Sequence, residues 1–152
     1  MTAFRKYYNV LLVPAISVIL IAFLSGFTEP DNERWIEEKL LERTRILQDC
    51  YYGAISISDA ENMLREFESD QLLKDDIMSL RQWEDTELDI VQKMSFVNII
   101  KKKEFMEYTT YEVGIRWDMS GIPEDYILEQ KYHLVVKNSR DTSFLSNFTP
   151  IT

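Results

Sequence analysis

Hydrophobic and polar positions divide the chain into three stretches with different periods. The first is an apolar run: no charged residue occurs between Lys6 and Glu29, which leaves 22 uncharged residues at 7–28. As a helix at about 1.5 Å per residue, this run reaches roughly 33 Å, enough to cross a hydrocarbon core of about 30 Å. Because the run has no polar face, it fits a buried core helix less well. The pattern predicts one N-terminal transmembrane helix.

The charges on either side of this run predict its orientation. Two bases, Arg5 and Lys6, precede it, whereas only acids follow it directly. The positive-inside bias therefore places the N-terminus in the cytoplasm and residues 29–152 outside it, with the run as a single-pass anchor in the cell membrane. A cleaved signal peptide is the alternative, although Gly-Phe-Thr at 26–28 is a poor cleavage site. We expect a retained anchor at 1–28, followed by one extracytoplasmic domain.

The second stretch has a helical period. Pro-Asp-Asn at 30–32 is predicted to open a helix that runs to about Tyr51, and a capping box at 58–61 opens a short helix at 59–68. Asp70 is a second N-cap candidate and precedes a third helix at about 71–83. The apolar stripe of the first helix contains Ile36, Leu40, Leu47 and Tyr51.

The third stretch changes to a period of two, which predicts strands. Residues 90–100 form the first, and the lysines at 101–103 with Glu104 suit a four-residue hairpin loop. The alternation at 111–119 is the clearest strand pattern, and further strands are predicted at 128–137 and 144–148. On the first strand we expect four residues to share the apolar face: Ile90, Met94, Phe96 and Ile100.

This order predicts an α+β fold: one N-terminal transmembrane helix, then three helices packed on a four-stranded antiparallel meander. One sheet face is apolar and should pack on the helices, while the other should face water. Matching the polar faces of the middle hairpin places Arg116 opposite Glu129 and Trp117 opposite Leu128.

The order of elements also resembles a known superfamily. The stretch from Thr109 to Phe148, with Tyr-Glu-Val-Gly-Ile-Arg-Trp at 111–117 and Phe-Leu-Ser-Asn-Phe at 144–148, is similar to small membrane-anchored extracytoplasmic proteins of the cystatin-like cone, or nuclear-transport-factor-two-like, superfamily. Members include a periplasmic subunit of type IV secretion and its relatives in conjugation machines. The resemblance implies helices around a curved sheet, and a place in a bacterial envelope, secretion or conjugation machine. Because the superfamily hosts enzymes, binders and assembly subunits, it implies no site residue.

Composition excludes several classes of function. The chain has 152 residues, of which 45% are hydrophobic, as in one globular domain. Its formal charge of −9 argues against a nucleic-acid partner, because such binding relies on Lys and Arg. One Cys and one His cannot close a zinc site. We expect no cofactor and no metal.

Negative charge is concentrated in one half of the predicted outer domain. Residues 28–90 carry 18 acids and 7 bases, whereas residues 91–152 carry 8 of each. A solvated set of helix faces explains such an excess without any partner. If it is an interface, the outward side of the first helix supplies it, through Glu37, Glu38 and Glu42.

Candidate catalytic residues are few. His133 is predicted on the polar face of its strand, paired with Glu112 or Glu129, and Cys50 is expected to be a small buried thiol. Neither a G-x-S-x-G motif nor a phosphate loop occurs. We therefore expect no catalytic residue and no enzymatic activity.

Two hypotheses of function follow. The first is a membrane-anchored interaction or assembly domain, with a protein partner or a second copy of the chain. The second is a small-ligand-binding module with a cavity between sheet and helices. The candidate lining of that cavity is aromatic: Trp83, Tyr111, Trp117 and Tyr132.

Overall fold

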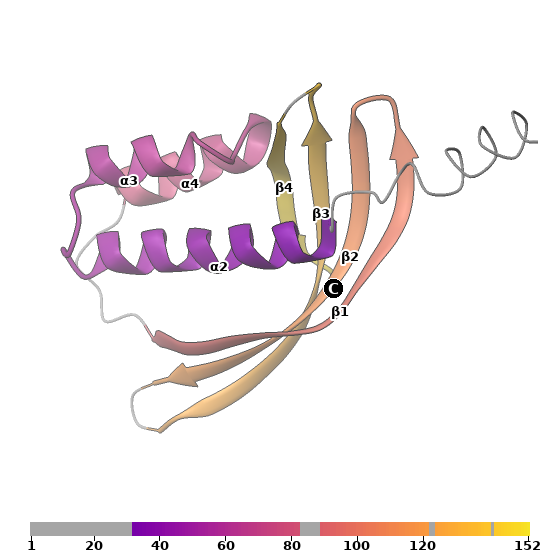
Figure 1. Cartoon of the computed structure of the whole chain (residues 1–152). Coiled ribbons are helices and arrows are strands. Elements are labelled where there is room, and N and C mark those ends of the chain that lie inside the picture. The colour runs from indigo at the N-terminus through magenta and orange to yellow at the C-terminus, as the bar shows by residue number, and fades with distance from the viewer. Residues whose placement is uncertain (1–31, 83–88, 122–123, 141) are drawn as a thin grey trace, which may run out of the picture. The chain divides into compact units, whose positions relative to one another are not determined.

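The structure is a computed structural model that describes residues 32–82, 89–121, 124–140 and 142–152. Three helices precede four strands, which confirms the α+β class (Figure 1). The helices are α2 (Asn32–Tyr51), α3 (Ile57–Leu64) and α4 (Asp70–Gln82), and the strands are β1 (Ile90–Phe105), β2 (Tyr108–Ser120), β3 (Tyr126–Asn138) and β4 (Ser143–Pro150).

The sheet is an antiparallel meander in the order β1-β2-β3-β4. Arg116 pairs with Glu129 and Trp117 with Leu128, so the predicted register of the middle hairpin is confirmed. The alternation along β2 is confirmed as well, since Trp117 is buried while Arg116 is exposed. Two-sided patterning of this kind fixes register, because a slip of one residue would turn every apolar side chain to water.

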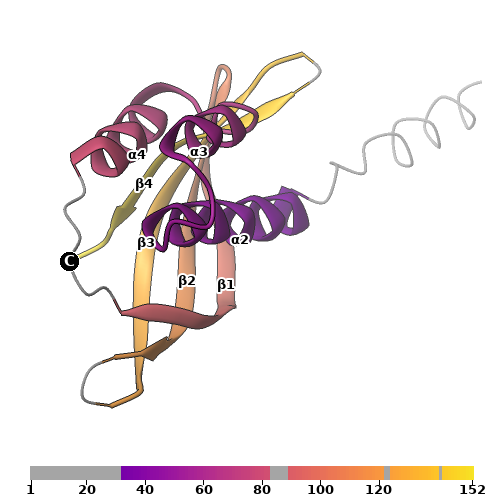
Figure 2. The same cartoon turned by 90° about the vertical axis from the view of Figure 1, so that its left-hand side faces the viewer.

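The helices lie on one side of the sheet, which curves around α2 (Figures 1 and 2). Apolar side chains fill the space between these layers. The fully buried ones come from both layers: Ile36, Leu40 and Ile46 of α2, Leu64 of α3, Leu80 of α4, and Ile115, Leu134 and Leu145 of the sheet. Burying each such side chain contributes about 1.5–3 kcal/mol, so this layer holds the helices on the sheet.

The predicted membrane segment at 7–28 lies outside the described residues. Within the described ranges, no helix is both long enough and apolar enough to cross a bilayer.

The predicted apolar face of β1 is wrong at two of its four positions. Ile90 and Ile100 are exposed, and Ile99 packs against the core instead. The cause is a set of bulges: the β1–β2 register shifts at Gln92 and again at Val97. Each extra residue reverses the alternation, so one period of two cannot describe the whole strand.

The predicted loop at 101–104 is also wrong, because β1 continues through the lysines to Phe105. The turn is formed by Met106 and Glu107, between the paired residues Phe105 and Tyr108. Met106 has a φ of 53°, a left-handed conformation that usually selects Gly or Asn. The sequence carries no such residue there, so the true turn has no signature.

The short helix begins and ends earlier than predicted. Its N-cap is Ser56, whose hydroxyl accepts the Asp59 N–H at 3.1 Å and donates to the Asp59 carboxylate at 2.6 Å. Ser58, the predicted cap, lies inside α3. Glu61, its expected capping partner, directs its carboxylate to Arg81 instead. After Leu64 the chain turns, and the backbones of Phe67 and Ser69 bond to Leu145 of β4.

The start of α4 is anchored to the sheet. Asp70 is its first residue, and its carboxylate accepts the hydroxyl of Ser146 at 2.8 Å and lies 3.6 Å from Lys137 Nζ. These partners lower the pKa of Asp70, with the Ser146 hydrogen bond as the largest cause. The predicted last residue, Trp83, lies outside the described ranges.

Candidate functional site

The predicted aromatic lining is only partly assembled in one place. Trp117 Nε1 donates to the Tyr132 hydroxyl at 3.0 Å, and Tyr132 stacks on Phe148 with ring centroids 4.3 Å apart. Tyr111 is buried further along β2. Trp83, the fourth predicted residue, is not among the described residues. Neighbouring aromatic rings of this kind pack a core as readily as they line a pocket.

One cavity does lie between α2 and the sheet, and Trp117 lines it. Its volume is about 230 Å³. It is walled on the helix side by Leu47, Gln48 and Tyr51, and on the sheet side by Val91. Gln48 fixes the two walls together, since its side chain accepts the N–H of Val91 at 2.9 Å and donates to the Val91 carbonyl at 3.3 Å. The volume is below the roughly 300–1,000 Å³ of ordinary ligand pockets.

A largely buried ionic cluster adjoins this cavity, since its central residue, Arg43, also lines the cavity. The guanidinium of Arg43 forms a bidentate pair with the Asp76 carboxylate, from Nε to Oδ2 at 2.7 Å and from Nη2 to Oδ1 at 2.6 Å. Glu68 completes the cluster, with Oε1 3.3 Å from Arg43 Nε. Because Arg43 comes from α2, Asp76 from α4 and Glu68 from the segment between α3 and α4, the cluster joins three parts of the helical layer.

Glu68 is the unsatisfied member of this cluster. Its side chain is fully buried, and neither carboxylate oxygen has a hydrogen-bond partner among the described residues. The nearby Arg43 N–H is already directed at Asp76. Burial, followed by the negative charge of Asp76, raises the pKa of Glu68 to about 9 despite the opposing charge of Arg43. Glu68 is therefore a neutral acid at pH 7.

Arg43 shows the opposite response. Burial would lower its pKa, but Asp76 and Glu68 outweigh burial and raise it, so Arg43 stays charged. Arg43 is thus the cation between two buried carboxyl groups. Two adjacent carboxyl groups suit acid–base chemistry in an accessible site. Here Glu68 is only 2% exposed, so the pair has no route to a substrate and holds the helices together.

The sequence did not single out this cluster, although it contained a signal. Arg43 falls between Leu40 and Leu47 on the apolar stripe of its helix, and Asp76 falls between Leu72 and Leu80 in the same way. A charged residue at three- or four-residue spacing from buried apolar residues faces inward. Buried charges need partners, so two such positions of opposite sign predict a pair.

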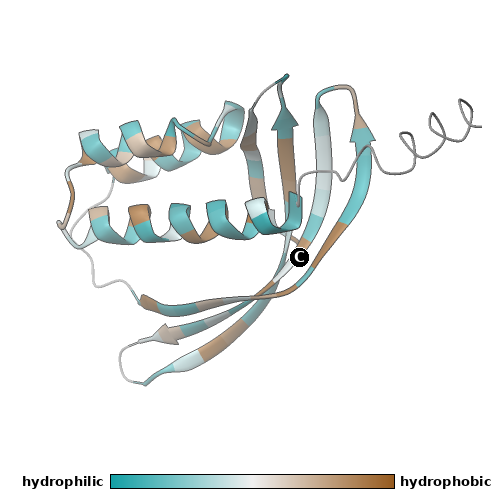
Figure 3. Cartoon of the chain, viewed as in Figure 1, coloured by the Kyte–Doolittle hydropathy of each residue, from teal (hydrophilic) through white to brown (hydrophobic). Residues whose placement is uncertain are grey.

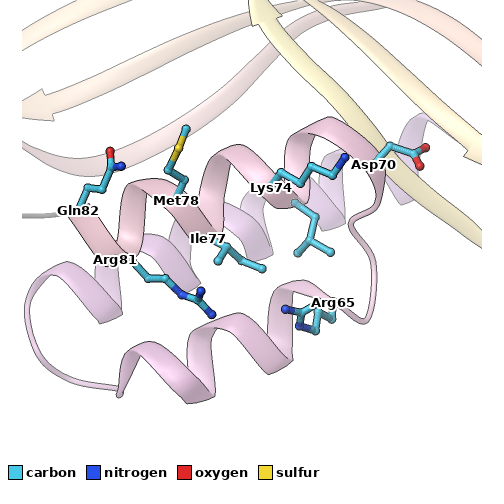
Figure 4. Close-up of a pocket in the computed structure, with 8 residues that line it drawn as sticks. Arg65, Asp70, Lys74, Ile77, Met78, Arg81 and Gln82 are labelled. Atoms are coloured by element: carbon cyan, nitrogen blue, oxygen red, sulfur yellow. The ribbon is translucent and has the colours of Figure 1, made fainter.

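The second hollow lies on the helices alone. A groove of about 630 Å³ follows α4 beside the end of α3 (Figure 4). Its apolar floor includes Leu73 and Ile77, and Figure 4 shows Ile77 and Arg81 pointing from α4 towards α3. Arg81 is held there by Glu61, with Nε 2.5 Å from Oε1 and Nη2 2.8 Å from Oε2. This hydrogen bond is the largest cause of the lowered pKa of Glu61.

The three acids predicted as an interface lie along α2 and are accessible to different degrees. Glu38 is exposed, whereas Glu37 and Glu42 are half-buried. Glu42 also forms an ion pair with Lys39, with the charged atoms 2.6 Å apart. A partner would have to compete with this local pair for Glu42.

The other titratable candidates lie apart from both hollows. His133 is exposed on β3 and is paired in register with Glu112, as predicted. The Glu112 carboxylate, however, is bound by Lys102 at 3.0 Å and Lys131 at 3.2 Å, which lower its pKa through hydrogen bonds. Cys50 is buried, as predicted, and burial raises the pKa of its thiol. In the part of the chain that the structure describes, no group of His, Cys, Asp and Glu could hold a metal ion.

Comparison with known proteins adds no family. The chain matches no protein-family model, and no curated protein matches it.

Proposed function

We propose that the chain is a membrane-anchored domain that acts by protein–protein contact outside the cytoplasm, as part of a bacterial envelope or secretion assembly. The packing between sheet and helices carries this proposal. Val113, Ile115, Leu134 and Leu145 are fully buried at the centre of the sheet, against the helices. The cavity between α2 and the sheet, at about 230 Å³, is smaller than ordinary ligand pockets. This favours binding at the surface, where apolar side chains at one end of the sheet are open to solvent.

The anchor in this proposal is residues 7–28, on the basis of the uncharged run and the two bases before it. Protease added to intact cells should remove the domain at 29–152 and spare the anchor. A mature protein that begins near Glu29 would show instead that the segment is a signal peptide.

The acidic side of α2 is the first candidate contact. The variant Glu37→Lys/Glu38→Lys/Glu42→Lys should co-purify with fewer envelope proteins than the wild type, because the charge of the surface is reversed. The matched control reverses three exposed acids elsewhere: Glu66, Glu104 and Glu124. If both variants retain the same partners as the wild type, α2 is not the interface.

The contact proposal also implies that catalysis is absent. His133→Ala and Cys50→Ser should both retain every partner, since His133 lies on a solvent face and Cys50 is a buried thiol. Loss of function in His133→Ala, with the acidic variant unaffected, would favour an enzyme.

A ligand-binding module is the second candidate, and the cavity beside Trp117 favours it. Native mass spectrometry of the full chain purified from membranes would reveal a bound small molecule. Val91→Phe should fill the cavity and remove that molecule, whereas Val97→Phe changes an exposed residue of the same strand and should retain it. If neither the wild type nor Val97→Phe carries a bound small molecule, the ligand-binding hypothesis is rejected.

A further inference from the structure

The N-terminal part of β3 has an edge that β4 does not cover. β4 pairs with β3 only from Tyr132 to Asn138, and the backbone of Ile151 extends this pairing to Lys131. Within the described residues, no backbone pairs with residues 126–130 on that side. We refer to residues 126–130 as the β3 edge.

The backbone groups available at this edge follow from the strand geometry. The carbonyl of Lys131 accepts the N–H of Ile151 at 2.8 Å, so residue 131 directs its polar groups away from β2. Successive residues of a strand direct these groups to alternate sides. Ile127 and Glu129 share the parity of Lys131, and their N–H and C=O groups therefore point outward from the sheet.

Three of the five side chains of the β3 edge are apolar and accessible. Ile127 is 57% exposed, Leu128 45% and Tyr126 42%, and they occupy both faces of the strand. Brown segments mark this end of β3 and the start of β1 in Figure 3. Exposed apolar strand edges are templates for pairing with another chain.

The opposite edge of the sheet shows how the same fold prevents such pairing. β1 is also an outer strand, but its register shifts at three places and it carries Lys93 and the lysines at 101–103. Bulges and lysines are the devices by which natural edge strands avoid association. The β3 edge has neither within residues 126–130.

The charge around the edge selects the kind of partner. On the outer face, Asp118 is paired in register with Ile127, Glu129 lies on the same strand as Ile127, and Asp125 directly precedes that strand. The bases on this face are Arg116, which lies 3.4 Å from Asp118 and 4.0 Å from Glu129, and Lys131, which is bound to Glu112. A second copy would bring the same acids to the contact, whereas a basic strand would be attracted.

We propose that the β3 edge binds an extended segment of a partner protein as an added strand. The outer face of the added strand would present Lys or Arg beside Glu129. Its inner face would present apolar side chains beside Leu128. This mode of recognition takes affinity from backbone hydrogen bonds and specificity from alternate side chains. The inference rests on the proposed contact function and assigns it a surface and a class of partner.

The test uses the full chain in detergent micelles and a labelled synthetic peptide of alternating lysine and valine. Ile127→Pro removes the N–H that points outward and leaves the pairing with β2, while Ile127→Val retains that N–H. Proline is tolerated at an edge where its missing N–H would face solvent. We expect Ile127→Pro to weaken binding about tenfold, the effect of one lost hydrogen bond with its contacts, and Ile127→Val to leave it unchanged.

Two further arms separate strand addition from simple charge attraction. A peptide of alternating lysine and proline has the same charge but cannot form the ladder, so it should bind more weakly than the lysine–valine peptide. Glu129→Lys should weaken the lysine–valine peptide and strengthen its glutamate–valine counterpart, even if Ile127→Pro fails to fold. Equal binding by all variants and peptides, or no binding at all, would overturn the proposal. A dimer that Ile127→Pro dissociates would do the same, since the occupant would then be a second copy.

Co-purification from membranes distinguishes this inference from the function on which it rests. If the wild type retains envelope partners and both Ile127→Pro and Glu129→Lys retain them equally, the β3 edge is rejected and the contact function stands. If the wild type retains no partner, the contact function itself fails.

Discussion

The two halves of β3 differ in what covers them. Leu134 and Leu128 lie on the same face of this strand, yet Leu134 is fully buried and Leu128 is 45% exposed. The difference comes from the neighbours: β4 and the helices cover the second half of β3, whereas β4 does not reach the first half. Alternation therefore identifies the face on which a side chain lies, but the other elements decide whether that face is covered.

This contrast extends to charges. Between the helices, Arg43 forms a bidentate pair with the buried Asp76 and lies 3.3 Å from the buried Glu68. In the open half, Arg116 lies 4.0 Å from Glu129 in a pair that is exposed on both sides. The same pairing of Arg with an acid thus holds the helices together in one place and contributes little in the other.

The largest loss of stability is expected at Trp117, which is paired with the exposed Leu128 but is itself buried. Trp117→Ala should lower the free energy of unfolding by about 3–5 kcal/mol, because Trp117 is buried and bonded to Tyr132. Leu128→Ala, at the position paired with Trp117, should lower it by less than about 1 kcal/mol, since Leu128 is exposed. Urea unfolding of the full chain in detergent, followed by circular dichroism, measures both. Equal effects would show that the open half of the sheet is covered in solution.

The charges give the next comparison. Arg43→Ala should destabilise the fold by about 3–5 kcal/mol, because it leaves the Asp76 carboxylate buried without its partner. Arg116→Ala should change the stability by no more than about 1 kcal/mol. The same unfolding measurement applies. A small effect of Arg43→Ala would mean that water reaches the cluster.

The difference between predictable and unpredictable parts of the fold follows the same division. The alternation of β2, the end of α2 at Tyr51 and the β2–β3 register were predictable, because each depends on one regular period that one buried face enforces. The face of β1 was not, because the extra residues at Gln92 and Val97 change the period within the strand.

A close contact between a backbone and a side chain could not be predicted from the sequence either. Next to the bulge at Val97, the Asn98 side chain accepts the N–H of Gly114 at 3.1 Å. A Cβ on Gly114 would lie 2.5 Å from that oxygen, so only glycine fits without a shift. Nothing in the alternation around Gly114 marks this requirement.

The candidate site was predictable only in outline. A cavity between sheet and helices was the alternative hypothesis from the sequence, and of its candidate lining residues Trp117 borders the cavity in the structure, whereas Tyr111 and Tyr132 do not. Which inward residues border a void depends on the curvature of the sheet, and bulges contribute to that curvature. The exposure of Leu128 has the same origin, since no local pattern reports where β4 ends.

Titration of Glu68 is the third test, and it acts on the covered half alone. The pKa of Glu68 is about 9 in the folded chain against an ordinary value of 4.5, so the folded state holds the extra proton between these pH values. Its stability should therefore fall as pH rises from 4.5 to 9, with a slope of at most about 1.4 kcal/mol per pH unit from this group.

Glu68→Gln is the matched variant, because an amide of the same shape cannot ionise. Its unfolding free energy should depend less on pH than that of the wild type across this range, and the difference should vanish below pH 4.5. Parallel pH profiles of the two proteins would show that Glu68 is ionised in the fold.

The smallest expected effect belongs to the open half. Arg116 and Glu129 are cross-strand partners, with Nη1 and Oε1 4.0 Å apart, and Arg116 Nε also lies 3.4 Å from Asp118. A double-mutant cycle with Arg116→Ala and Glu129→Ala should give a coupling of about 0.2–1 kcal/mol. Salt should reduce it further, because both side chains are in water. A coupling above this range, insensitive to salt, would mean that another chain covers the β3 edge under the conditions of the measurement, and dilution of the protein should then reduce the coupling.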